Sequence, residues 1–277
     1  FSPDGSKIAY QSMERDGYES DLDRLFVYDI SGGTRSWVTE GWTYDVSAIN
    51  WADENTLFFS CAHHGTAQVF RTSLTGKEVS KVTEGVHDLS ALSFRSGILV
   101  AQQNSMSMAP EVAKVDVNTG EVRQISFINR PIYESIKMGR VDEKYIKTKD
   151  RKDLQMWIIY PPDFDPSKKY PALLFCEGGP QSALTQFWSY RWNFQIMAAN
   201  GYIVFAPNRR GVAGFGQEWK EQISGDYGGL NMQDYLDATD AMAKEPYVDA
   251  SRLGAVGASY GGYSVFYLAG IHEKRFK

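Results

Sequence analysis

The sequence predicts blades of a β-propeller followed by an α/β domain with a mostly parallel sheet. The first half repeats itself with a period of about 43 residues, which is the length of a four-stranded propeller blade. The second half alternates buried strands with helices, the pattern of a parallel sheet. A length of 277 residues suits two domains of about 150 residues each. We therefore expect a partial propeller over residues 1–130 and an α/β domain over residues 131–277.

Composition and charge argue against several classes of protein. Hydrophobic residues make up 43% of the chain and charged residues 23%, as in globular proteins and unlike disordered ones. The net charge of -5 and the lack of a basic block argue against a nucleic-acid partner. No apolar run approaches the roughly 18 residues of a membrane span. We expect no nucleic acid, no membrane span, no metal and no other cofactor.

The repeat is carried by a tetrapeptide and by the strands around it. Val-Thr-Glu-Gly at residues 38–41 recurs at residues 82–85, a shift of 44, and Ile-Ser at residues 125–126 is a weaker third copy. An alternating run and a polar turn precede each copy, which predicts half-buried strands joined by hairpins. A generic antiparallel sandwich is the alternative, but the turns, strands and tetrapeptide all share one period.

The number of repeats is small for a propeller. We count about three blades, whereas closed propellers have about four to eight. An open arc of three blades would leave a long sheet edge unpaired. We therefore expect the C-terminal part of a larger propeller, and a chain that begins inside a domain.

The pattern changes after residue 130. Two antiparallel strands are expected at residues 145–148 and 156–160, on either side of a charged turn. Short apolar runs then predict buried parallel strands, with helices between them. In order, we expect a strand at 172–176, a helix at 187–200, a strand at 202–206, a helix from 230 to before Pro246, and a strand at 253–256. On the second helix, the aspartates are expected to point outward: Asp234, Asp237 and Asp240.

The last strand leads into a glycine-rich turn with a candidate nucleophile. Residues 257–261 are Gly-Ala-Ser-Tyr-Gly, and an apolar helical run follows. G-x-S-x-G between a strand and a helix is the nucleophile elbow of α/β-hydrolases, a sharp turn whose strained serine exposes its hydroxyl. Gly257 and Gly261 let the neighbouring backbones approach closely. A bystander serine in an ordinary turn is the alternative, but the strand-turn-helix setting favours Ser259 as a nucleophile.

An acyl-transfer site also needs N–H donors for the developing oxyanion. One donor is expected to be the backbone N–H of Tyr260, the residue after the nucleophile. The other is expected in the loop Glu-Gly-Gly-Pro at residues 177–180, which follows the strand at 172–176. We assign this second donor to the N–H of Gly179, with Gly178 as the fallback. An ordinary tight turn is the alternative interpretation of the loop.

Together with the upstream repeat, these motifs resemble the prolyl oligopeptidase family of serine peptidases. The resemblance rests on four motifs in order: the loop at 177–180, Asn-Arg-Arg-Gly at 208–211, Gly-Asp-Tyr-Gly-Gly at 225–229 and the elbow at 257–262. Within the family, the chain looks most like bacterial dipeptidyl-peptidases and acylaminoacyl-peptidases. The resemblance implies a propeller that caps an α/β-hydrolase domain, short peptides as substrates and an acyl-enzyme on Ser259. It favours a periplasmic location over a cytoplasmic one and leaves a homodimer open.

Two further residues are weighed as substrate-binding groups. Relatives carry His or Tyr where Glu177 stands, and an ionised Glu cannot donate a hydrogen bond to an oxyanion. Glu177 could instead bind the free amino group of a peptide, the alternative being a salt bridge to a nearby arginine. Arg210, like its neighbour Arg209, could bind a substrate carboxylate. The alternative, which we favour, is that both arginines brace their loop through buried hydrogen bonds.

The sequence does not reveal the general base. In this fold an Asp or Glu and then a His follow the nucleophile, and only His272 follows Ser259, in the helix directly behind the elbow. We interpret the pair His63-His64 as part of a polar turn and not as a metal site. We expect the catalytic Asp and His beyond residue 277, and this chain alone to be inactive.

Two rival functions remain. A carboxylesterase is the first, but many small esterases carry a third glycine where Pro180 stands, and an upstream propeller is not expected in them. The second is a non-catalytic propeller-hydrolase protein that only binds its partners. The intact elbow argues against this second rival.

Overall fold

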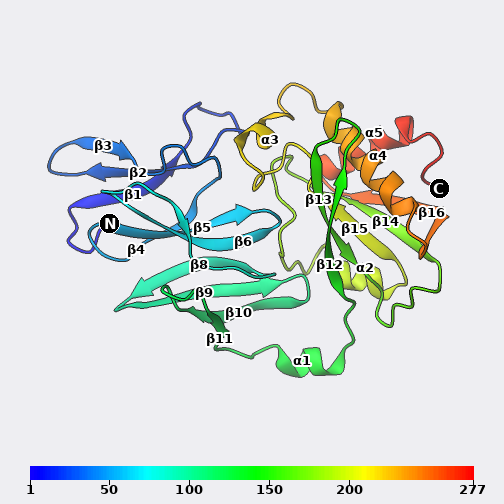
Figure 1. Cartoon of the computed structure of the whole chain (residues 1–277), viewed down its shortest axis with the longest axis horizontal. Helices are drawn as coiled ribbons and strands as arrows, with labels where there is room; N and C mark the ends of the chain where they lie inside the picture. The colour runs from blue at the N-terminus through cyan, green and yellow to red at the C-terminus, as the bar shows by residue number, and fades with distance from the viewer. The chain divides into compact units, whose positions relative to one another are not determined.

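Small antiparallel sheets form the first part of the chain in a computed structural model that describes residues 1–277 (Figure 1). The first blade has three strands: β1 (Lys7–Ser12), β2 (Arg24–Asp29) and β3 (Thr34–Trp37). The second blade has four: β4 (Ser47–Trp51), β5 (Thr56–His63), β6 (Thr66–Ser73) and β7 (Ser80–Lys81). The third also has four: β8 (Asp88–Arg95), β9 (Ile98–Ser105), β10 (Met108–Val115) and β11 (Val122–Gln124). One parallel pairing, between Ala67 of β6 and Asp88 of β8, joins the second and third blades into an eight-stranded sheet.

A hydroxyl group at the same place in each blade explains the tetrapeptide repeat. In each blade this oxygen accepts a hydrogen bond, 2.8 to 3.1 Å long, from a strand N–H 14 residues earlier. The pairs are Thr39 with Leu25, Thr83 with Val69, and Ser126 with Val112. Because each of these strand N–H groups takes the hydroxyl as its acceptor, the same residue type recurs once per blade.

Apolar clusters fill the space between consecutive blades. Leu57 and Phe59 of β5 pack with the first blade, whereas Phe58 between them packs with the third. Side chains alternate across a strand, so one strand can supply both clusters. The middle blade is therefore covered on both faces, which is how propeller blades are stabilised.

Two segments from later in the chain, Thr185–Phe187 and Gly214–Gln217, belong to the same compact unit as the blades. The buried Asp88 carboxylate in β8 accepts hydrogen bonds from the Ala67 N–H at 2.8 Å, the Thr185 hydroxyl at 2.6 Å and the Gln186 N–H at 3.1 Å. Burial raises the pKa of Asp88 to about 6, although these three donors oppose the rise.

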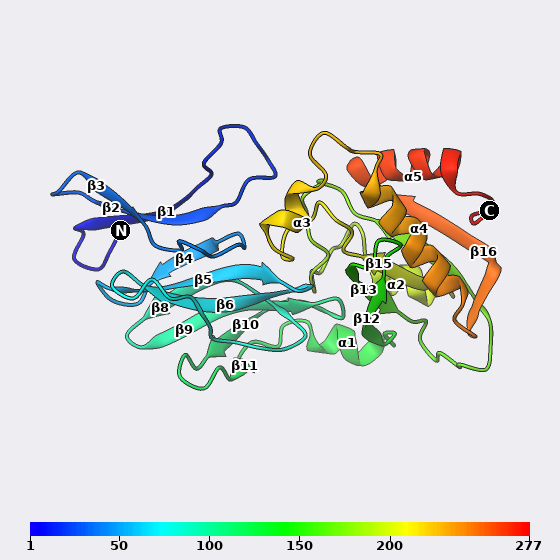
Figure 2. The ribbon, with the colours of Figure 1, turned by 45° about the horizontal axis from the view of Figure 1, so that its top comes forward.

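The second unit contains a five-stranded sheet in the order β12-β13-β15-β14-β16. β12 (Val141–Lys147) and β13 (Asp153–Ile159) are antiparallel, and β14 (Tyr170–Cys176) runs parallel to both β15 (Ile203–Pro207) and β16 (Val248–Gly257). The helices are α1 (Arg130–Ser135), α2 (Phe194–Ala199), α3 (Gln217–Glu221), α4 (Leu230–Ala243) and α5 (Tyr260–Ile271). Both α4 and α5 lie beside β16 (Figures 1 and 2).

The helix predicted at residues 187–200 is wrong over its first half. Only α2 forms there, because Asn193 is its N-cap and its side chain accepts a hydrogen bond from the Ile196 N–H at 3.2 Å. Trp192, just before the cap, packs edge-on against Phe175 with ring centroids 6.3 Å apart. Aromatic packing thus replaces helix in this segment.

No helix is both long enough and apolar enough to cross a membrane.

Candidate active site

Ser259 lies in a sharp turn between the last strand and the last helix. β16 ends at Gly257 and α5 begins at Tyr260, so two residues make the whole connection. Ser259 has φ 56° and ψ -127°, which is strained backbone for a residue with a side chain. Its side chain is exposed and forms no capping hydrogen bond with α5. The hydroxyl is therefore open to react.

The glycines of this turn are required by close backbone contacts. A Cβ atom at Gly257 would lie 2.5 Å from the carbonyl oxygen of Gly261 and 2.7 Å from that of Cys176. A Cβ atom at Gly261 would also collide with the Cys176 oxygen. Since Cys176 pairs with Gly257 where β14 runs beside β16, the turn closes against the end of β14. Only residues without a side chain fit there.

The same strand pairing brings the loop at residues 177–180 next to Ser259. A Cβ atom at Gly178 would lie 3.6 Å from the Ser259 Cβ and 3.3 Å from the Ala258 oxygen. Gly179 follows with φ 108°, a conformation that favours glycine. The structure thus places Gly178 against the serine and Gly179 one residue further along. The N–H groups of both remain candidate donors.

Hydrogen bonds of its side chain hold Tyr260 in place, and its backbone forms the first residue of α5. Its hydroxyl donates to the Tyr227 carbonyl oxygen at 2.8 Å, and it also accepts a hydrogen bond from Asn231 Nδ2. As the first residue of a helix, Tyr260 has no intrahelical acceptor for its N–H. This N–H is therefore available beside Ser259.

Glu177 is half-buried at the end of β14 and takes part in no ion pair. The salt bridge considered for it is therefore not formed. Burial raises the pKa of the Glu177 carboxyl, while the Gly178 N–H and the charge of Arg209 oppose the rise. Because no lysine or arginine forms an ion pair with this carboxylate, it can accept a cation from a ligand.

Arg210 does not face an open site, which corrects the substrate-binding role considered for it. Its side chain is buried, and all five N–H donors have acceptors: two with Asp234, two with Asp150 and one with Gln222. The guanidinium holds the pKa of Asp150 well below its usual range. No donor remains for a substrate, so Arg210 braces its loop.

The prediction that Asp234 points outward is also wrong. Asp234 is fully buried on α4, and its oxygens accept from the Arg210 backbone N–H and side chain at 2.8 to 2.9 Å. The sequence did not indicate the structural role of Asp150 and Asp234, because their partner Arg210 lies far from them in the chain. A pair of arginines after a buried strand was the available signal, because such charges need carboxylates nearby.

The histidines offer no base for Ser259 within the second unit. His272, the only histidine of that unit, follows the end of α5, which begins beside Ser259. A helix of 12 residues is roughly 18 Å long, so His272 is out of reach. His63 and His64 lie among aromatic rings of the first unit. No group of three or more His, Cys, Asp or Glu side chains could hold a metal ion.

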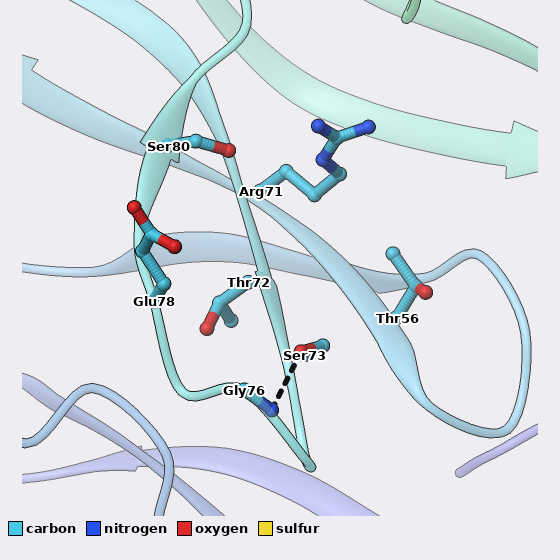
Figure 3. A pocket seen from close by; sticks show the side chains of 7 residues that line it. All are labelled: Thr56, Arg71, Thr72, Ser73, Gly76, Glu78 and Ser80. Carbon is cyan, nitrogen blue, oxygen red and sulfur yellow. Dashed lines mark hydrogen bonds between the residues drawn. The ribbon is translucent and has the colours of Figure 1, made fainter.

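A surface pocket on the second blade contains none of the predicted site residues (Figure 3). The Gly76 N–H donates to the Ser73 hydroxyl at 3.1 Å across its lower edge. Its lining is mostly polar and comes from β5, β6, β7 and the turn between β6 and β7: Thr56, Arg71, Thr72, Ser73, Gly76, Glu78 and Ser80. The candidate site is the turn at Ser259 with its loop, and not this pocket.

Comparison with known proteins identifies relatives over the whole chain. Residues 188–277 match the model of the prolyl oligopeptidase family. The chain is 48% identical over 277 residues to dipeptidyl-peptidase 5 of Porphyromonas gingivalis and 31% identical over 280 residues to dipeptidyl-peptidase 5 of Schizosaccharomyces pombe. It spans about 40% of the length of these curated relatives.

Solved structures share the fold. The acylaminoacyl peptidase of Pyrococcus horikoshii superposes with a TM-score of 0.85 at 24% identity, over 99% of this chain and 42% of that one. Dipeptidyl peptidase 4 of Porphyromonas gingivalis gives 0.76 at 25% identity, over 98% and 38%. The predicted fold class, propeller blades followed by an α/β-hydrolase sheet, is confirmed. This chain thus resembles the prolyl oligopeptidase family through residues 188–277 and the dipeptidyl-peptidase 5 proteins along its whole length.

Proposed function

We propose that this chain supplies the nucleophile and the oxyanion hole of a serine peptidase that acts on short peptides. The observation that carries the proposal is the exposed Ser259 in a strained turn, with Gly178 directly beside it. Relatives named dipeptidyl-peptidase 5 favour the release of dipeptides over the release of acyl-amino acids.

The proposed reaction has two steps. The Ser259 oxygen attacks the scissile carbonyl carbon while a general base takes its proton, and the negative carbonyl oxygen is bound by the Tyr260 N–H and an N–H of residues 178–179. The C–N bond breaks, and the amine leaves with the proton. Water then attacks the acyl-enzyme, so the dipeptide leaves as an acid and Ser259 regains its proton. Because His272 is out of reach, the base is another residue.

The proposed role of Glu177 is to bind the free amino group of the substrate. Its carboxylate lies at the start of the loop that contacts Ser259, and no ion pair occupies it. An ammonium group would offset the burial that raises its pKa. This arrangement suits an enzyme that cleaves its substrate at a fixed distance from the peptide N-terminus.

Substrate comparison tests the proposed activity. The intact protein should cleave dipeptidyl anilides with a free amino group faster than blocked ones, and Ser259→Ala should abolish both activities. Rapid hydrolysis of a simple aryl ester without peptide cleavage would instead indicate the carboxylesterase.

The second oxyanion donor needs a test other than proline substitution. Proline requires φ near -65°, whereas Gly179 has φ 108°, so Gly179→Pro would break the turn as well as remove the N–H. Replacing the residue by glycolic acid removes only the N–H. At Gly179 this change should lower kcat by about 10²–10³, and the same change at Gly178 is the control. A larger loss at Gly178 would transfer the assignment to that residue.

A further inference from the structure

Arg209 is a buried charge that forms no ion pair. Its side chain is fully buried, yet unlike its neighbour Arg210 it forms no ion pair with a carboxylate. Its Nη2 atom has no hydrogen-bond partner at all. Burying a charge without pairing it is costly, so its presence calls for an explanation beyond packing.

The contacts of Arg209 join the two segments that carry the candidate oxyanion donors. Its Nη1 donates to the Pro180 carbonyl oxygen at 3.0 Å, at the end of the Glu-Gly-Gly-Pro loop. Its guanidinium carbon lies 4.8 Å from the centre of the Tyr260 ring, a cation–π contact. A weaker contact, from Nε to the Tyr235 hydroxyl at 3.3 Å, reaches neither segment. The Arg209 side chain thus contacts both the loop at residues 177–180 and the elbow at Ser259.

The backbone around Arg209 holds the guanidinium in place. Nη1 also donates to the Arg210 carbonyl oxygen at 3.1 Å, and the Arg209 carbonyl oxygen accepts from Trp219 Nε1 at 3.1 Å. The charge of Arg209 acts on both Glu177 and Tyr260. Burial raises the pKa of Glu177 and that of Tyr260, the latter to about 12, and the charge of Arg209 opposes both rises.

We propose that Arg209 is a positioning residue that sets the separation of the two oxyanion donors. This inference rests on the proposed function, because it concerns the oxyanion hole of the same reaction. The guanidinium fixes Pro180, and with it the N–H groups of Gly178 and Gly179, relative to Tyr260. A misplacement of about 1 Å in such a site can cost about 10²-fold in rate. Arg209 touches no reacting atom and acts only through these segments.

Substitution of Arg209 in the intact protein tests the proposal. Arg209→Met should lower kcat by about 10²-fold while KM changes less than about threefold, because the hole acts mainly in the transition state. Affinity for a peptidyl aldehyde, which forms an oxyanion on Ser259, should fall with kcat. The melting temperature should fall only modestly, because removal of an unpaired buried charge offsets the cost of leaving the Pro180 and Arg210 carbonyl oxygens without their donor. Arg209→Lys, which keeps the charge and an ammonium group that can donate, should restore part of the rate.

Tyr235→Phe is the matched control, because it removes the Arg209 contact that reaches neither donor segment. It should keep kcat within about threefold. Wild-type kcat in Arg209→Met, or a loss of melting temperature without a loss of kcat, would overturn the positioning role. If Arg209→Met does not fold, Arg209→Lys decides the question by the same comparison. A wild-type protein that does not react with a fluorophosphonate at Ser259 would instead refute the proposed function itself.

Discussion

Replacing Gly257 by alanine should separate the elbow from the strand beside it. The new Cβ atom would lie 2.5 Å from the Gly261 oxygen and 2.7 Å from the Cys176 oxygen, where ordinary contacts begin at 3.4 Å. The backbone must therefore open by about 0.9 Å, the difference between 3.4 and 2.5 Å. Neither neighbour can rotate away, since both are carbonyl groups of the main chain. Overpacking of this kind typically costs about 1–3 kcal/mol of unfolding free energy.

The same displacement should lower activity more than it lowers stability. An error of about 1 Å between nucleophile and oxyanion hole is worth about 10²-fold in rate. Gly262→Ala is the matched control, because its Cβ atom would meet nothing closer than the Gly257 oxygen at 3.7 Å. Alanine also suits a helix better than glycine by up to about 1 kcal/mol. We expect Gly262→Ala to be at least as stable as the wild type.

Urea unfolding and fluorophosphonate labelling of the intact protein measure the two effects. Gly257→Ala should unfold at lower urea and label about 10²-fold more slowly, whereas Gly262→Ala should match the wild type in both assays. Equal stability and equal labelling rates for the two variants would refute the argument from backbone contacts.

Three further predictions follow from buried charges. Asp88 has a pKa of about 6 in the folded protein against 3.8 ordinarily, so the folded state holds its proton more tightly. The unfolding free energy should therefore fall by about 2 kcal/mol between pH 4 and pH 7, and urea titrations should show a smaller fall in Asp88→Asn. Arg210→Met should cost about 3–5 kcal/mol by leaving Asp234 buried without its partner, and adding Asp234→Asn should recover most of this loss in thermal melts. Glu177→Gln should weaken cleavage of unblocked dipeptide anilides more than of blocked ones, and equal kcat/KM losses would remove its amine-binding role.

The parts of the structure that follow local rules could be predicted from the sequence. The blade period follows from one hydroxyl per repeat, which bonds a strand N–H 14 residues away. The geometry at Ser259 follows from the order of a strand, a two-residue turn and a helix. Glycine occupies the positions where the turn closely approaches other backbone segments. These features depend on neighbours in the chain, and residue types reveal them directly.

The parts that depend on distant partners could not be predicted. The helical spacing predicts an exposed side chain for Asp234. Arg210, 24 residues earlier, instead forms a buried ion pair with it. A helix is predicted for the aromatic-rich segment at residues 187–193, but the N-cap of the helix comes only at Asn193. Propensity sets the expectation in both cases, and tertiary contacts override it.

The most direct test of the central claim is the site at which a fluorophosphonate attaches to the intact protein. We predict a single adduct, mapped by peptide mass spectrometry to Ser259 and absent from a folded Ser259→Ala variant. Peptide cleavage without an adduct on Ser259, or an adduct that persists in Ser259→Ala, would contradict the assignment of this serine as the nucleophile.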